Sequence, residues 1–159
     1  MLTRIAATAQ AYATGTRFMD RLVGDFTPAD WAARDAAGHD PRWIVGHLAA
    51  IRHRVAALAG QPQPAAAWET SFARGTSPAD LPAALDPAEL LAAFHAADAV
   101  LASAWEGLTD EALDRPLGRA MPDGSDTVAG ALAFLAWHEA YHMGQLGLLR
   151  RLAGKPGAA

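Results

Sequence analysis

Residues 127–152 read TVAGALAFLAWHEAYHMGQLGLLRRL and form the longest helical pattern in the chain. No proline interrupts the segment, and Gly154 and Pro156 follow it, as is typical of a helix end. Because an α-helix turns about 100° per residue, His138 and His142 lie on one face, which we predict to be the buried face. The other residues predicted on this face are Phe134, Gln145, Leu149 and Leu152.

Three further helical patterns precede this segment. They run from about Leu2 to Val23, from about Pro41 to Leu58, and from the Asp86-Pro87 start signal to Leu108. The residues between the second and third patterns are rich in Pro, Gly and Ser and show no clean period, and long connections of this kind often border a site. We find no convincing set of strands. The sequence therefore predicts an all-α fold, a four-helix bundle with a long crossover between helices 2 and 3, in a single domain over residues 1–159.

The short segments between these helices also carry signals. Thr27 and Pro28 are typical of the start of one short helical turn. Asp123-Gly124 predicts a tight turn, and with it a small hairpin.

Composition excludes several classes of function. The 159 residues carry a net charge of -4 and no run of Lys or Arg, so we expect no nucleic-acid partner. The absence of cysteine excludes disulfides, thiolate ligands and a cysteine nucleophile. The start of the sequence lacks the apolar core of a signal peptide, and no apolar run is long enough to span a bilayer. We therefore expect a cytoplasmic protein with no membrane partner.

Three of the six histidines are candidate metal ligands. His138 and His142 lie on the buried face of the last helix, and His47 lies at the edge of the apolar stripe of the second helix. Burying imidazoles without partners is costly, so a shared divalent metal is a natural explanation, with a metal-free histidine cluster as the alternative. We expect no function for the other three, namely His53, predicted exposed, His95, off the apolar face, and His39, in a loop.

The sequence His-Glu-x-x-His within this last helix also invites comparison with zinc proteases. Such enzymes need a third ligand, usually further along the chain, and a strand edge that holds the peptide. The residues after His142 contain no His, Asp or Glu, and no sheet is predicted. The protease interpretation therefore fails.

Two segments, HEAYHMGQL and PRWIVGHLAAIRHRV, resemble the last and second helices of the DinB-like (damage-inducible) metal-binding family. The resemblance implies a metal site formed by His47, His138 and His142, the same residues selected by their facing. Many members carry His-His-Arg-Gly-Gln where this chain has Tyr141-His142-Met143-Gly144-Gln145. The resemblance also implies a homodimer, and its characterised members include thiol S-transferases and a thiol-dependent isomerase.

Three hypotheses for function follow. A divalent cation, with zinc or nickel expected first, acidifies a bound water or thiol, and this favours either hydrolysis or transfer of a low-molecular-weight thiol to a small molecule. The alternative is a non-catalytic metal-binding or stress-response module.

Several side chains near the ligands have candidate roles. Glu139 is a candidate general base, or else a structural residue, and Gln145 is a candidate hydrogen-bond partner of a ligand imidazole. Tyr12 and Tyr141 are candidates for lining the pocket or the core. Arg150 and Arg151 are expected to complement the helix dipole.

Overall fold

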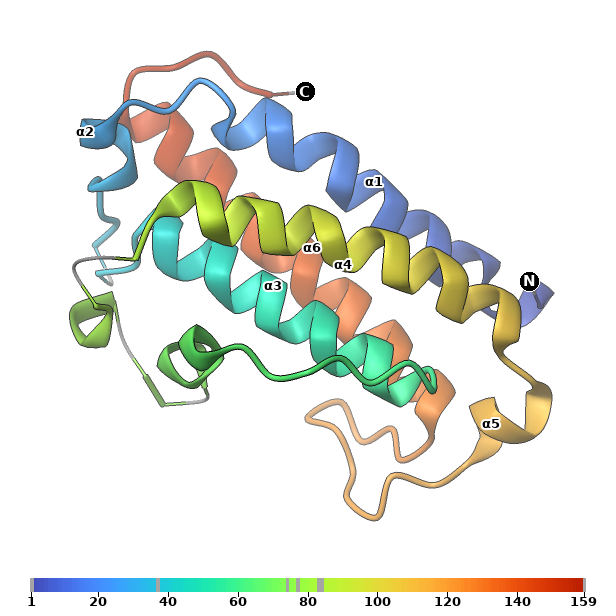
Figure 1. Cartoon of the computed structure of the whole chain (residues 1–159). Helices are drawn as coiled ribbons and strands as arrows, with labels where there is room; N and C mark the ends of the chain where they lie inside the picture. Colours follow the sequence, from blue (N-terminus) through green and yellow to red (C-terminus); the bar gives the residue numbers. More distant parts are fainter. Residues whose placement is uncertain (1, 37, 74, 77, 83–84, 159) are drawn as a thin grey trace.

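Four long helices dominate the computed structural model, which describes residues 2–36, 38–73, 75–76, 78–82 and 85–158 (Figure 1). They are α1 (Ala6–Val23), α3 (Pro41–Leu58), α4 (Pro87–Gly107) and α6 (Val128–Leu152). The short elements are η1 (Thr3–Ile5), α2 (Pro28–Trp31), η2 (Ala67–Phe72), η3 (Pro78–Asp80) and α5 (Asp110–Asp114). The described residues form no strand, only an isolated bridge between Pro116 and Thr127. The predicted all-α four-helix bundle is confirmed.

Each long helix packs on two others. Both α1 and α3 contact α4 and α6, so α1 and α3 lie on opposite sides of the bundle. Helix α6 therefore lies directly beside α3. This arrangement brings the two histidines of α6 next to the helix that carries His47.

Local signals account for the helix starts. The side chain of Asp40 accepts a hydrogen bond of 2.8 Å from Trp43 N at the start of α3, and Pro41 occupies the first position. Thr127 caps α6 in the same way, and Thr27 forms a capping box with Asp30 at α2. The predicted bounds of α3 agree with the structure. Helix α5, capped by Thr109, was not predicted.

The core consists of two apolar halves. One half holds Tyr12, Val55, Trp105 and Leu132, and the other holds Met19, Leu48, Phe94 and Leu146. The residues between these halves along each helix include buried polar groups, among them Arg52 and Glu139. A polar layer therefore crosses the middle of the bundle.

One prediction for α6 and one for His53 are wrong. Leu152 is 62% exposed, because the buried face of α6 is centred on Leu135, Glu139 and Leu146 rather than on the predicted stripe. Arg150 lies in the last turn of α6, as expected, and it is also buried, pairs with Asp25 and donates to the carbonyl oxygen of Leu22. His53, predicted to be exposed, is half-buried.

The connection between α3 and α4 runs back along α3 (Figure 1) and positions η2 against it. Phe72 of η2 is buried, and its ring lies so close to Gly46 that a Cβ at this glycine would overlap it. Gly46 directly precedes His47. The close approach of η2 to α3 therefore occurs beside a predicted ligand and requires glycine.

The loop before α6 folds back on itself. Leu117 N donates to Asp126 O and Met121 N donates to Ser125 O, each at 2.7 Å, and Gly124 has a φ of 87° at the turn. The tight turn predicted at Asp123-Gly124 is therefore present. None of the described helices is long and apolar enough to cross a membrane.

We predict that Gly46→Ala lowers the free energy of unfolding by about 1–3 kcal/mol, because the added methyl group displaces Phe72. Gly147→Ala in α6 is the matched control, since its Cβ would meet only Leu22 at an ordinary 3.7 Å. The control should gain roughly 0.5–1 kcal/mol from the higher helix propensity of alanine. Urea unfolding measures both values, and equal effects of the two substitutions would contradict the packing described here.

Candidate metal centre

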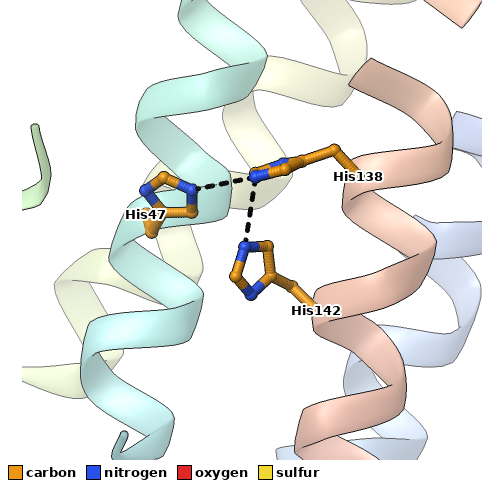
Figure 2. Close-up of side chains that lie close together, drawn as sticks. All are labelled: His47, His138 and His142. Carbon is orange, nitrogen blue, oxygen red and sulfur yellow. Dashed lines mark hydrogen bonds between the residues drawn. The ribbon is translucent and has the colours of Figure 1, made fainter. Parts of the chain in front are cut away.

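His47, His138 and His142 point toward one another from α3 and α6 (Figure 2). The Nε2 atom of His138 lies 3.5 Å from Nε2 of His47 and 3.2 Å from Nε2 of His142. One potential ligand atom from each ring lies within 4.8 Å of the others. The structure thus brings together the three histidines selected from the sequence.

These separations match those of metal ligands. Zinc–nitrogen bonds are about 2.0–2.1 Å long, so two nitrogens of a tetrahedral site are about 3.3 Å apart. The two Nε2–Nε2 separations lie on either side of that value. A divalent cation could therefore bind all three nitrogens with only small side-chain movements.

The other ring nitrogens fix the orientation of two of the imidazoles. His47 Nδ1 lies 3.1 Å from the carbonyl oxygen of Phe72, and His142 Nδ1 lies 2.6 Å from Oε1 of Gln145. Because these oxygens can only accept, each Nδ1 donates, and the Nε2 lone pair is left free for a metal. Outer contacts of this kind are typical of metal-binding histidines. The hydrogen bond expected from Gln145 is therefore present.

His138 differs from the other two. Its Nδ1 atom is buried and has no hydrogen-bond partner among the described residues. Its Nε2 atom, in contrast, faces the Nε2 atoms of both other rings. The Nε2 atoms of His47 and His142 carry lone pairs that are both directed at Nε2 of His138. A cation shared by the three rings would stabilise this arrangement.

Burial lowers the pKa of all three histidines. The pKa of His138 falls to about 4, chiefly because of burial and then because of the charges of His47 and Arg54. The pKa of His142 also falls to about 4, through burial and the neighbouring imidazoles, and burial lowers the pKa of His47. The three rings are therefore neutral at pH 7, the state in which imidazole binds a metal.

The histidines open onto a pocket of about 810 Å³. This volume lies within the range typical of small-molecule sites. Trp43 stacks on His47 with ring centroids 4.8 Å apart, and Phe134 and Met121 form parts of the apolar wall. Tyr12 lies in the core, and Tyr141 is 53% exposed, so neither is among the residues that line the pocket.

Glu139 is not among the residues that line this pocket. It is buried, and its two carboxylate oxygens accept hydrogen bonds of 2.9 and 2.7 Å from Nε and Nη2 of Arg52. Arg52 thus contacts both carboxylate oxygens, and Glu139 lies on the side of α6 that faces the bundle interior. Glu139 is therefore not positioned to act as the general base considered from the sequence, and the structural role considered beside it agrees with this geometry.

Arg52 is a buried charged residue that sequence reasoning missed. It is fully buried, donates to Thr16 Oγ1 at 2.8 Å and lies 3.7 Å above the centre of the Phe94 ring. Thr16 in turn donates to Asp98. Each long helix thus contributes one member to this polar layer: Thr16 from α1, Arg52 from α3, Asp98 from α4 and Glu139 from α6. The available signal was that Arg52 continues the apolar stripe of Ile44 and Leu48 at intervals of four residues.

The remaining histidines each contact a carboxylate instead. Nδ1 of His39 lies 3.1 Å from Asp35, Nδ1 of His53 lies 2.9 Å from Glu69, and Nε2 of His95 lies 2.9 Å from Asp20. None of the three belongs to the cluster that could hold a metal ion.

Comparison with known proteins agrees with the fold. Residues 11–146 match the DinB superfamily, and the chain belongs to this family. A solved structure, YfiT from Bacillus subtilis, superimposes with a TM-score of 0.68 at 20% sequence identity, over 94% of this chain and 87% of that chain. That protein is described as a probable metal-dependent hydrolase with an unusual four-helix bundle topology. Among curated proteins, none matches the sequence.

We predict that the pH dependence of stability identifies the buried imidazoles. An unfolded histidine binds a proton below about pH 6.5, whereas folded His138 stays neutral to about pH 4, so unfolding is favoured as the pH falls between these values. In metal-free protein, His138→Leu removes the share of this effect that His138 contributes, while His47 and His142 keep theirs. Urea unfolding at pH 7 and pH 5 should show that the variant loses less stability than the wild type on acidification. An equal or larger loss in the variant would contradict the lowered pKa.

Proposed function

We propose that this protein is a metal-dependent enzyme that acts on a small molecule in the pocket beside His47, His138 and His142. The observation that carries the proposal is the convergence of three neutral Nε2 atoms at separations suited to one cation. A structural metal site usually has four protein ligands, whereas three leave a position for water or substrate. The opening of the cluster onto a pocket supports a catalytic site rather than a closed one.

The residues around the cluster have distinct tasks in this proposal. Phe72 and Gln145 hold the rings of His47 and His142 in one tautomer. Trp43 covers one face of His47 and limits the access of water. When bound, a divalent cation supplies positive charge that acidifies a coordinated water or thiol at neutral pH.

Of the two reactions, transfer of a thiol to an electrophile is the first candidate. Glu69 is the only carboxylate among the described residues that line the pocket, and it already contacts His53 and the backbone nitrogen of Ala66. Both contacts use Oε1 of Glu69, and no other carboxylate among the described lining residues offers a base for an attacking water. A thiol, which is far more acidic than water, needs no such base near a cation. The thiol would come from a low-molecular-weight cosubstrate, since the chain has no cysteine.

Hydrolysis is the second candidate, and the description of YfiT as a probable metal-dependent hydrolase favours it. The two reactions can be separated with one electrophilic ester and the metal-loaded protein. Thiol transfer requires added thiol and produces a thioether or thioester, whereas hydrolysis proceeds without thiol and produces the acid. If neither product forms faster than with metal-free protein across several thiols and esters, the protein is a non-catalytic metal-binding module.

The proposed metal site predicts an order of metal affinities. His47→Ala, His138→Ala and His142→Ala each remove a ligand and should weaken zinc binding more than Gln145→Leu. The Gln145 variant loses only an outer contact, an effect of roughly 10- to 100-fold. His95→Ala is the control, because it also breaks an imidazole–carboxylate contact but lies on α4 outside the cluster. Competition with a chromogenic chelator measures each affinity. If His95→Ala weakens zinc binding as much as His47→Ala does, the assignment of the ligands is wrong.

We also propose that the protein forms a homodimer through α6. Trp137, Tyr141, Leu148 and Leu152 are each more than half exposed and lie along one side of this helix. Their spacing is symmetric about a point near Gly144. Trp137 and Leu152 lie equally far from this point, and so do Tyr141 and Leu148. A twofold axis at Gly144 would pair these residues between antiparallel copies, as a self-complementary interface requires.

This interface predicts that Leu148→Glu yields a monomer, because each twofold contact would bury two added charges. Ala102→Glu, at an exposed position of α4, is the control and should leave the mass unchanged. Analytical ultracentrifugation over a wide concentration range distinguishes the two outcomes. A monomeric wild type, or a variant that remains dimeric, would rule out the α6 interface.

A further inference from the structure

Arg54 stands on the same face of α3 as His47. The two residues are seven positions apart, which is two helical turns, or about 10 Å along the helix axis. Both line the pocket, and the Arg54 side chain is exposed. One wall of the pocket thus carries ligand nitrogens at one end and a positive charge at the other.

A second arginine reaches the pocket from a different segment. Arg119 belongs to the loop between α5 and α6, which the hydrogen bonds of Leu117 and Met121 fold back on itself. Arg119 is exposed and lines the pocket together with Met121. Positive side chains from α3 and from this loop therefore border the same pocket.

Neither arginine forms an ion pair within the described part of the chain. The ion pairs there involve other arginines, namely Arg4, Arg34, Arg42, Arg52 and Arg150. The single carboxylate among the described lining residues, Glu69, is held by His53 and the backbone of Ala66. The remaining wall is largely apolar and includes Trp43, Ile51, Phe72, Phe134 and Leu135.

We propose that the pocket binds a small molecule with an apolar body and a carboxylate group, and that Arg54 and Arg119 hold this carboxylate. Guanidinium groups bind carboxylates through charge-assisted, often bidentate, hydrogen bonds. When the arginines bind the carboxylate, the other end of the molecule lies at the three histidines, about two helical turns away along α3. The placement of the reacting end rests on the proposed function, whereas the arginine site does not depend on a metal.

A pair of probes tests the carboxylate site. 4-Phenylbutanoate and 4-phenylbutanamide have the same apolar body and differ in the charge of one end. Calorimetry with zinc-loaded wild type should show roughly tenfold tighter binding of the carboxylate, and added salt should reduce this preference. In Arg54→Gln, and more fully in the double variant with Arg119→Gln, the preference should fall below about threefold, with the amide affinity unchanged. Arg21→Gln, an exposed α1 position outside the pocket, should keep the wild-type preference.

Two outcomes would overturn the proposal. Equal affinity of the wild type for both probes would show that the pocket does not select a negative charge. A preference that survives in the double variant would mean that the carboxylate binds elsewhere, for example directly to the zinc ion. Zinc content measured on the same variants should equal that of the wild type. Because the titrations can be repeated on metal-free protein, loss of the metal site and loss of the arginine site are distinguishable.

Discussion

The ion pair between Arg52 and Glu139 joins the two helices that carry the three histidines. Both groups are buried, and breaking such a pair by removing one partner typically costs about 3–5 kcal/mol, because the other charge is left without a counterion. Arg52 lies on α3 five residues after His47, and Glu139 lies on α6 between His138 and His142. The bidentate geometry therefore limits rotation of α3 against α6, on which the convergence of the imidazoles depends.

The other two helices complete this layer. Thr16 of α1 accepts from Arg52 and donates to Asp98 of α4, while Arg52 also donates to the carbonyl oxygen of Tyr12. A side chain on Gly15 of α1 would overlap the Glu139 carboxylate, so glycine lets α1 approach the pair closely. One face of α6 is thus fixed by charge inside the bundle, and the adjacent face presents His138 and His142 to the pocket. The apolar halves above and below exclude water from the pair and strengthen it.

Helical periodicity and start signals were sufficient to predict the bundle and the three histidines. Asp40 and Pro41 locate the start of α3, and the facing of His47, His138 and His142 follows from 100° per residue. The role of Arg52 could not be predicted in this way, because its partner lies 87 residues away and only the packing of α3 on α6 brings them together. The same reason explains the error at Leu152, whose exposure depends on the rotation of α6, and the unpredicted contact of Arg150 with the end of α1.

X-ray absorption spectroscopy of the zinc-loaded protein tests the central claim most directly, because it reports the atoms bound to the metal. The structure predicts three imidazole nitrogens at about 2.0–2.1 Å, with oxygen from water completing the shell. His138→Ala should reduce the imidazole signal to two rings. A zinc ion surrounded mainly by carboxylate oxygens, or one with fewer than three imidazoles in the wild type, would contradict the account.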